Sequence, residues 1–418
     1  MARFSMESLS GRRHLYAKRF GPRMESPNEA PRGDPVRVLL LAEAAGLSLQ
    51  VVMCLAQMGA EVHALVRPGA RQLRWSRHCR TVELFDFHPD VTPIEQTRRR
   101  ISELAVQHDL DVAVPVSTLS ATVLDRLRTE IPLRCFPIGD GEAVQRLNDK
   151  WSFDGLCRVH GVNAPRTLFF AGRAAIALDR VAAELGFPLV VKPANLGDRV
   201  GVVIARSAKE LRAQVIDNPA YNFERLVVQA FVPGRDLDLN VLAIGGVMVA
   251  HSTQVREGRT VVFTEDDELL RQCARIIAAT KYDGLAHFDA IRHAQDGSPW
   301  LLECNARAWG SIAASAFCGL NFIEAGIAAA LDRPLPPVHI EPAASFLTPP
   351  HAMMRGLGLG GRGPPLSAAT RAGLRVALRD PIGTMAVALT PSGKRLPGLD
   401  HIGAGIAQFV RRAMKLPT

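Results

Sequence analysis

The stretch that decides the fold is WLLECNAR, residues 300–307. Its apolar first half indicates a buried strand, and the period-two alternation of a strand puts Glu303, Asn305 and Arg307 on one face. Two oxygen ligands beside one fixed cation suit Mg²⁺ bound to a polyphosphate, and a core strand has no need of that combination. We therefore expect a cation site on this face.

A second strand precedes this one. Residues 286–291 (AHFDAI) have strand character, and Asp296-Gly297 between the two strands is a hairpin-turn signal. Folding about that turn brings Asp289 roughly opposite Glu303, so that two carboxylates and an amide would surround a hard cation. A surface hairpin with solvated acids is the alternative, but both acids sit inside apolar runs, where unpaired charge is costly.

Composition bounds the class of protein. The 418 residues allow two or three domains, and 47% hydrophobic with 22% charged residues is typical of a soluble globular protein. We expect no membrane span and no secretory signal, because no apolar run approaches the necessary length. The seven cysteines are scattered, without a C-x-x-C pair, which favours reduced thiols in a cytoplasmic protein.

The net charge of +9 lies mainly at the ends, since residues 1–35 contribute +3 and residues 340–418 contribute +7. Solvated arginines explain this simply, and we expect no nucleic-acid partner. A polyanion-binding protein that uses these ends is an alternative.

Residues 1–35 are rich in Arg, Ser, Pro and Gly and are expected to form a disordered basic tail. Residues 36–145 alternate strands and helices, which predicts an open α/β domain with a parallel sheet. Its elements include strands at 36–41, 61–66 and 112–116, a helix at 44–58, and a helix capped by Ser117. The first turn, AEAAG, lacks the G-x-G-x-x-G pattern, so a dinucleotide-dependent oxidoreductase is disfavoured.

Residues 146–335 are expected to form α+β structure. Helices are predicted at 146–164, 174–185, 207–217, 265–280 and 309–330, and strands at 165–170, 188–206, 226–263 and 284–305. The prolines at 334–337 mark a linker. The remainder, 336–418, is assigned no function.

A lysine and a glycine-containing loop come next to each other near residue 192. VVKP (190–193) ends a strand with Lys192, and the loop 194–202 contains Gly197 and Gly201. Its backbone N–H groups could cover a phosphate, with Lys192 as a point charge. The P-loop pattern is absent, and an ordinary hairpin with a surface lysine is the alternative.

Residues 229–232 (QAFV) end an apolar strand and could offer an adenine ring backbone donors and acceptors. Asp236 could then bind the ribose, although a plain β-meander is the alternative. We expect His287 to face the other side of its strand from Asp289, in a structural role.

The order of these motifs resembles the ATP-grasp superfamily, most nearly its carbamoyl-phosphate synthase and biotin carboxylase type. The resemblance covers about residues 36–335. It implies a pre-ATP-grasp α/β domain at 36–145 and a two-subdomain ATP-grasp domain at 146–335. The flap subdomain of the latter would span about 165–225, and 336–418 would be a C-terminal extension.

The resemblance also implies roles for individual residues. Lys150 and Lys192 would bind phosphates, Gly197 and Gly201 would belong to the flap, and Arg307 would steady the transferring phosphoryl group. The adenine hinge would comprise Gln229, Ala230, Phe231 and Val232, with Asp236 on the ribose. The Mg²⁺ ligands, which could also hold Mn²⁺, would be Asp289, Glu303 and Asn305.

Three positions depart from the common pattern of the superfamily. Gln229 replaces a frequent Glu, Asp289 replaces a frequent Glu, and the flap is sparse in glycine. None of these departures removes a required function.

The activity implied is that of an ATP-dependent ligase joining a small-molecule carboxylate to an amine, or to a thiol, through an acyl-phosphate. The alternative is a nucleotide-binding regulatory protein without ligase chemistry. The resemblance is compatible with a homodimer.

Overall fold

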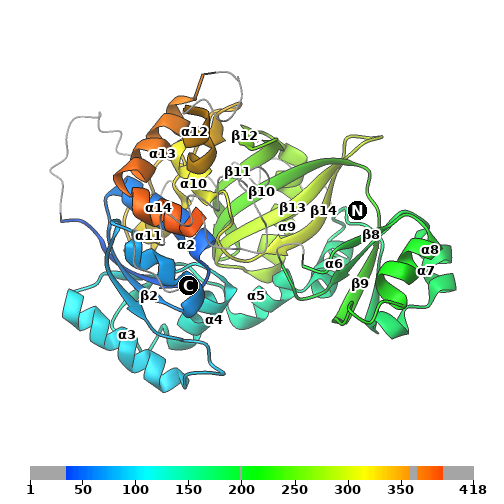
Figure 1. Cartoon of the computed structure of the whole chain (residues 1–418), viewed down its shortest axis with the longest axis horizontal. Coiled ribbons are helices and arrows are strands. Elements are labelled where there is room, and N and C mark those ends of the chain that lie inside the picture. Colours follow the sequence, from blue (N-terminus) through cyan, green and yellow to red (C-terminus); the bar gives the residue numbers. More distant parts are fainter. Residues whose placement is uncertain (1–33, 198–199, 357–364, 389–418) are drawn as a thin grey trace, which may run out of the picture.

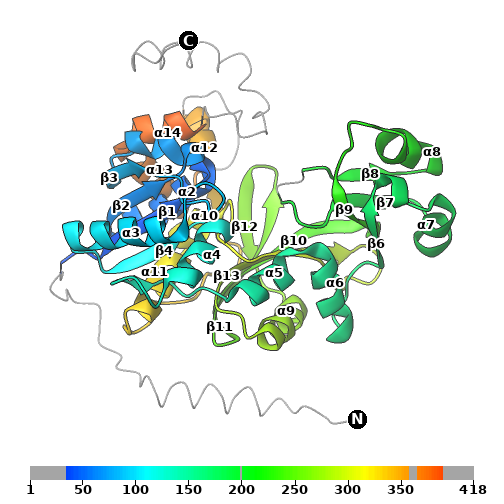
Figure 2. The same cartoon turned by 90° about the horizontal axis from the view of Figure 1, so that it is seen from below.

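A computed structural model of the chain describes residues 34–197, 200–356 and 365–388. Most of the predicted basic tail therefore lies outside the described residues. The described chain forms three sheets, arranged as two bodies at the ends and a central sheet that joins them (Figures 1 and 2).

The N-terminal domain is a five-stranded parallel sheet in the order β3-β2-β1-β4-β5, which confirms the predicted open α/β architecture. Its strands are β1 (Arg37–Ala42), β2 (Glu61–Val66), β3 (Cys79–Leu84), β4 (Val112–Pro115) and β5 (Arg134–Cys135). Its helical elements are α2 (Ala45–Met58), the 3₁₀ helix η1 (Pro68–Trp75), α3 (Ile94–His108) and α4 (Thr118–Leu127). As expected, the Ser117 side chain caps α4.

Two helices, α5 (Gly141–Asn148) and α6 (Lys150–Val159), lead into a small second sheet. This sheet has the order β6-β9-β7-β8. Its elements are β6 (Thr167–Gly172), a 3₁₀ turn η2 (Arg173–Ala175), α7 (Leu178–Leu185), β7 (Leu189–Pro193), β8 (Val203–Ala205), α8 (Ala208–Leu211), the π-helical turn η3 (Arg212–Ile216) and β9 (Glu224–Ala230). The helix predicted at 174–185 is thus shorter, and the one at 207–217 changes to π geometry. This subdomain has a core of its own.

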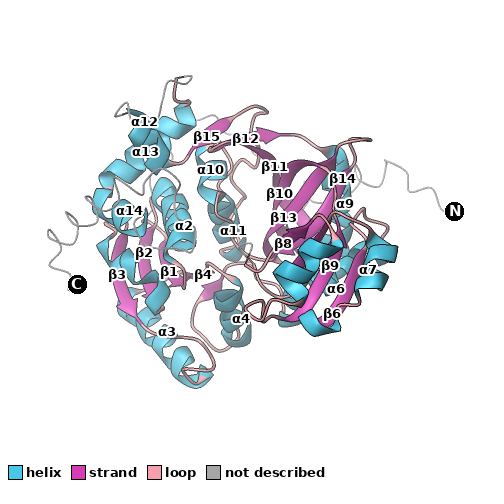
Figure 3. Ribbon diagram, turned by 45° about the vertical axis from the view of Figure 1, so that its right-hand side comes forward, coloured by secondary structure: helices cyan, strands magenta, loops and turns pink. Residues whose placement is uncertain are grey.

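The central sheet is antiparallel and has the order β14-β13-β10-β11-β12-β15. Its strands are β10 (Gly234–Ile244), β11 (Val247–Glu257), β12 (Thr260–Thr264), β13 (Gly284–His293), β14 (Pro299–Asn305) and β15 (Ser345–Leu347). Helix α9 (Asp267–Thr280) packs on it through β10, β11 and β14. Figure 2 shows this sheet between the other two bodies, and Figure 3 shows the small sheet in front of it.

The chain then returns to the N-terminal domain. The helix predicted at 309–330 is two helices, α10 (Ile312–Phe317) and α11 (Phe322–Ala330), both packed on α2. They are separated at Gly319, whose φ of +118° does not continue a helix. The central sheet and the N-terminal domain consequently share one hydrophobic core.

The C-terminal segment spans both bodies. Strand β15 extends the central sheet, whereas α12 (Pro349–Gly356), α13 (Ala368–Arg379) and α14 (Pro381–Ala388) lie by the N-terminal domain, with α13 on α2 and α14 on η1. Buried Asp380 accepts hydrogen bonds from Ser76 Oγ (2.5 Å) and Arg77 N (3.0 Å). Within the described residues, no helix has the length and apolar character that crossing a membrane requires.

Candidate functional site

The hairpin predicted from the sequence is strands β13 and β14, in which Asp289 pairs directly with Glu303. The connection contains the expected Asp296-Gly297 turn, between His293 at the end of β13 and Pro299 at the start of β14. Gly297 has a φ of +71° and donates its N–H to His293 O at 3.0 Å. The pairing of the two acids is set further along the strands, by the register of β13 and β14.

The central sheet extends this pair into two polar rows. Residues directly opposite one another in antiparallel strands share a face. One row, across β10, β13 and β14, is Asp238, Asp289 and Glu303. The next row is Asn240, His287 and Asn305.

The metal-ligand candidates are linked by hydrogen bonds. Asn305 Nδ2 donates to Asp289 Oδ2 at 2.9 Å, and Arg307 Nη2 donates to Asn305 Oδ1 at 3.1 Å. Cys304, between them in sequence, is buried in the hydrophobic core on the opposite face. The structure thus brings Asp289, Glu303, Asn305 and Arg307 together at the end of β14.

The orientation that we expected for His287 is wrong. Two residues apart on one strand, His287 and Asp289 share a face, and His287 Nε2 lies 3.5 Å from Asp289 Oδ1. His287 Nδ1 lies 2.8 Å from Asn240 Oδ1, and its ring stacks on Trp309 at 5.9 Å between centroids.

The charges in this cluster perturb one another. Burial acts to lower the pKa of His287, but the adjacent Asp289 outweighs it and the net shift is upward. Burial acts to raise the pKa of Asp289, but His287, Glu303 and Lys192 together outweigh it, so that the net shift is downward. Burial raises the pKa of Asp238, and the nearby Asp289 adds to this rise.

Asp238 and His287 are members of the site that the sequence reasoning missed. Potential ligand atoms of Asp238, His287 and Asp289 all lie within 4.8 Å of one another. The sequence could have predicted the orientation of His287, because residues two positions apart in a strand point to the same face, here that of Asp289. Asp238 required knowledge of the β10–β13 pairing, which joins segments distant in sequence.

Both predicted phosphate lysines reach the same carboxylate. Lys150 Nζ lies 3.2 Å and Lys192 Nζ lies 3.9 Å from Glu303 Oε2. Lys150 is N1 of α6, whose cap Asp149 accepts from Ser152 N, and Lys192 belongs to β7. Both lysines are buried, and burial lowers the pKa of Lys192, assisted by the like charge of Lys150.

The loop 194–202 lies over this cluster, except that residues 198 and 199 are outside the described chain. Lys150 Nζ donates to Leu196 O at 2.6 Å. A side chain at Gly197 would lie 3.6 Å from Arg307 Nη2. Gly201 is further away, held by Tyr221, whose hydroxyl donates to Gly201 O at 2.6 Å.

The predicted hinge continues from β9 into the start of the central sheet. Gln229 is buried and donates from Nε2 to Thr167 Oγ1 at 3.0 Å, so its side chain is part of the flap sheet. The N–H groups of Ala230 and Phe231 donate to Arg166 O (2.9 Å) and Pro188 O (3.3 Å). These two donors are therefore committed to the fold, and Val232 follows them as a buried residue. Asp236 is exposed on β10, two residues before Asp238 and on the same face.

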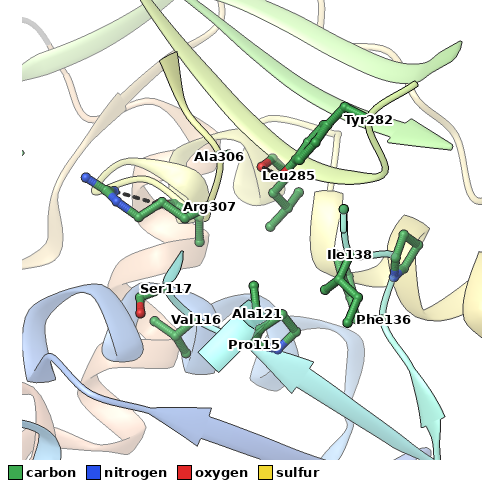
Figure 4. A pocket seen from close by; sticks show the side chains of 13 residues that line it. Pro115, Val116, Ser117, Ala121, Phe136, Ile138, Tyr282, Leu285, Ala306 and Arg307 are labelled. Carbon is green, nitrogen blue, oxygen red and sulfur yellow. Dashed lines mark hydrogen bonds between the residues drawn. The ribbon is translucent and has the colours of Figure 1, made fainter. Parts of the chain in front are cut away.

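A small pocket of about 20 Å³ adjoins Arg307, between the N-terminal domain and the central sheet (Figure 4). Val116 and Ser117 line it from the end of β4, and residues 306–308 line it from the end of β14. In Figure 4, Ser117 and Arg307 are seen at one side of the pocket, and Phe136 and Ile138 at the other.

Two family models match the chain. Residues 222–347 match the family described as ATP-grasp in the biosynthetic pathway with Ter operon, and residues 169–264 match the D-Ala–D-Ala ligase C-terminus. A D-alanine–D-alanine ligase of Pseudomonas putida (strain GB-1) is 29% identical over 180 residues, which are 39% of this chain and 54% of that protein. A D-alanine–D-alanine ligase of Legionella pneumophila (strain Corby) is 45% identical over 62 residues, which are 15% of this chain and 17% of that protein. The chain spans about half of the length of the first curated relatives that it matches.

Solved structures with the same fold are more distant in sequence. An N5-carboxyaminoimidazole ribonucleotide synthetase in an ADP complex has a TM-score of 0.58 at 14% identity, covering 83% of this chain and 97% of that one. The L-amino acid ligase from Bacillus licheniformis has a TM-score of 0.53 at 16% identity, and the match covers 74% of this chain and 78% of that one. Biotin carboxylase from Campylobacter jejuni has a TM-score of 0.54 at 14% identity, covering 72% of each chain.

The three-sheet architecture, with a small sheet folded over the polar end of a central antiparallel sheet, is the ATP-grasp fold. The two family matches, one to an ATP-grasp family and one to the D-Ala–D-Ala ligase C-terminus, together span residues 169–347 and agree with that fold.

Proposed function

We propose that this chain is an ATP-dependent carboxylate–amine ligase that binds Mg-ATP and forms an acyl-phosphate. The observation that carries the proposal is the pairing of Asp289 with Glu303 beneath two buried lysines. Carboxylates that face each other in this way repel each other unless a cation or a shared proton lies between them, and a bound cation would relieve the repulsion. Lysines that are buried together likewise favour an anion in their neighbourhood.

The donor set fits a hard cation. Asp289, Glu303 and Asn305 offer only oxygen ligands from one face of β13 and β14, which suits Mg²⁺, and Mn²⁺ accepts the same ligands. His287 and Asp238, beside them, would orient Asp289 rather than complete an all-oxygen site. When bound, the ion would neutralise charge on the γ-phosphate.

The remaining nucleotide contacts follow from position. Lys150 and Lys192 would exchange Glu303 for phosphate oxygens, with the loop from Gly197 to Gly201 above them. The hinge would use the N–H of Val232, because those of Ala230 and Phe231 are bonded within the flap sheet. Asp236 would bind the ribose from the start of β10.

The first step needs positioning and charge neutralisation more than covalent help. An oxygen of the substrate carboxylate attacks the γ-phosphorus, and the bond to the β-phosphate oxygen breaks, which releases ADP. Arg307, held by Asn305, would bind the phosphoryl oxygens. A neutral amine then attacks the acyl carbon. The carbon–oxygen bond to phosphate breaks, phosphate leaves with the electron pair, and the nitrogen loses a proton to solvent.

The test is ADP and phosphate release by the full chain with Mg-ATP, over pools of carboxylates combined with amines or thiols. The wild type should release ADP only when a carboxylate and its acceptor are present. Glu303→Gln should lower turnover about a thousandfold, which corresponds to about 4 kcal/mol. Glu142→Gln, at an exposed position on α5, is the matched control.

Near-normal ADP release by Glu303→Gln would overturn the assignment of the metal ligands. ATP binding without release from any pool would instead favour a nucleotide-binding regulatory protein. Product formed with thiols and not with amines would change the acceptor class and leave the first step intact.

A further inference from the structure

The first turn of α6 is tied to the small sheet by contacts that the proposed chemistry does not use. Lys150 donates its backbone N–H to Ala194 O at 2.8 Å, and Ala194, which directly follows β7, donates its own N–H to Arg225 O at 2.8 Å. The guanidinium of Arg225 reaches back to α6, where its Nη2 lies 2.8 Å from Asp149 Oδ2. Because Asp149 directly precedes Lys150, these four residues close a ring.

The Asp149 carboxylate uses its two oxygens for different purposes. Oδ1 caps α6, accepting from Ser152 N at 2.9 Å and from Ser152 Oγ at 3.0 Å. Oδ2 is inaccessible to solvent and has no hydrogen bond of good geometry among the residues that the structure describes. A buried carboxylate oxygen needs a compensating charge, and the Arg225 guanidinium supplies it. The ion pair therefore fixes the N-terminus of α6 against β9.

The backbone of Arg225 has a conformation that suits glycine better than arginine. Its φ is +54°, which side-chain-bearing residues rarely adopt. Such a conformation persists where the surrounding structure over-determines it. Here the carbonyl is held by Ala194 N, and the guanidinium lies over the Phe169 ring, 5.9 Å from its centroid, as well as beside Asp149. An arginine at this position indicates that its side chain has a task there.

The ring joins the elements that carry the two phosphate lysines. Lys150 belongs to α6 and Lys192 to β7, yet both reach Glu303 Oε2. Lys192 lies two residues before Ala194, so the hydrogen bond between Lys150 N and Ala194 O sets the spacing of the two lysines along the chain. The ion pair made by Arg225 holds the same two elements together from β9.

We propose that Arg225 is a positioning residue of the ATP site. Through its ion pair with Asp149, it keeps Lys150 at the spacing from Lys192 that lets both ammonium groups bind one polyphosphate. This role rests on the proposed ligase function and deepens it, because it extends the phosphate site to a residue that acts through another side chain. A lysine held on the phosphates contributes in the ground state and in the transition state alike. Loss of the pair should therefore raise the KM for ATP more than it lowers kcat.

Four variants of the full chain test this role. Arg225→Gln removes the charge and leaves the backbone preference at a positive φ nearly unchanged. Asp149→Asn removes the opposite charge and keeps the α6 cap, since asparagine caps helices as well as aspartate does. Arg225→Lys keeps a cation. Arg166→Gln is the matched control, because it breaks an ion pair of the same 2.8 Å length, to Glu184 on α7, that does not involve α6.

The affinity for Mg-ATP is measured by calorimetry, and the KM for ATP by ADP release. Arg225→Gln should raise both constants about tenfold to thirtyfold, with kcat within about threefold of wild type. Asp149→Asn should have a similar effect, and the double variant should be no worse than either single variant, because both remove one contact. Arg225→Lys should stay within about threefold of wild type and Arg166→Gln within about twofold.

Stability separates positioning from a purely structural role. Arg225→Gln leaves the Asp149 carboxylate without its cation, so the protein should unfold at a lower urea concentration than wild type. Addition of Asp149→Asn removes the unpaired charge and should restore the midpoint of unfolding, but it should not restore the affinity for ATP. An ATP affinity that returns together with the stability would show that Arg225 only supports the fold.

Other outcomes would also contradict the proposal. An unchanged KM and affinity in Arg225→Gln would remove the positioning role while the ligase activity of the wild type stands. A normal KM in Asp149→Asn, or additive losses in the double variant, would mean that Arg225 does not act through Asp149. Absence of ADP release by the wild type over all pools would overturn the ligase function itself, and the ATP affinities of the variants would still decide the role of Arg225.

Discussion

Lys150 Nζ lies 3.2 Å from Glu303 Oε2. Lys150 is the first residue of α6, and Glu303 lies near the C-terminal end of β14. Each group thus supplies the counter-ion of the other, and in the proposed mechanism phosphate and a cation would take over these roles. Because the same exchange serves both groups, we expect nucleotide and metal ion to enter together.

Lys150→Met should weaken ATP use and also destabilise the protein. Glu303, whose side chain is 22% exposed, would lose its nearest cation, at a cost of about 1–2 kcal/mol. Adding Glu303→Gln should restore most of that stability and none of the activity, because the pair is coupled. Urea denaturation and ADP release measure the two effects. Additive losses of stability in the double variant would show that the pair does not interact.

Gln229→Glu, which restores the residue frequent in the superfamily, should destabilise this chain. Thr167 Oγ1 accepts from Gln229 Nε2 at 3.0 Å and donates to Pro165 O at 2.8 Å. A carboxylate at residue 229 would face that hydroxyl without a donor, which costs about 1–3 kcal/mol. Chemical denaturation at pH 7 checks this, and the KM for ATP should not improve. A gain in ATP affinity without loss of stability would indicate that the side chain faces the nucleotide instead.

Gly201→Ala should be much more damaging than a glycine substitution at an open site. Gly201 has a φ of +70°, and a Cβ there would lie 2.8 Å from the Phe223 ring and 2.9 Å from Pro193 Cγ. We expect a loss of about 2–4 kcal/mol, which combines strain with overpacking. Gly258→Ala, with a φ of +61° and nothing within 4 Å, is the control and should cost about 1 kcal/mol. Equal thermal shifts for the two variants would contradict the packing argument.

The stability of the protein should depend on pH through Glu43. Burial raises its pKa to about 7 in the folded chain, from an ordinary value of 4.5. A raised pKa means that the folded state holds the proton more tightly, so this contribution is full below about pH 4.5 and is lost as the pH rises through about 7. The difference amounts to on the order of 3 kcal/mol. The unfolding free energy of wild type minus that of Glu43→Gln should fall between pH 5 and pH 8. A constant difference over that range would show that Glu43 titrates normally.

The local parts of the site followed from the sequence. The Asp289–Glu303 pairing was predicted because the two strands are neighbours in the chain and each has a clear period of two. Capping of α4 by Ser117 and the end of α2 at Met58 were predicted for the same reason, since a helix end depends on a few adjacent residues. The parallel sheet of the first domain was predicted from its alternating strands and helices.

Features that depend on distant packing were missed or incomplete. Asp238 joins the metal-ligand candidates only because β10 pairs with β13. The hinge donors at Ala230 and Phe231 are occupied only because β6 and β7 flank β9. No local period reports such pairings, because strand neighbours are chosen by the packing of the whole sheet.

By itself, the sequence determined a hairpin with acids on one face, two lysines ahead of it, and the superfamily whose motif order they follow. Only the tertiary structure decided that both lysines meet Glu303 and that His287 faces Asp289. It also decided that the Glu43 carboxylate is buried beside Ser117 and Ser120. The physical reason is that burial and charge pairing arise when separate sheets close on one another, whereas strand periodicity is a property of each segment alone.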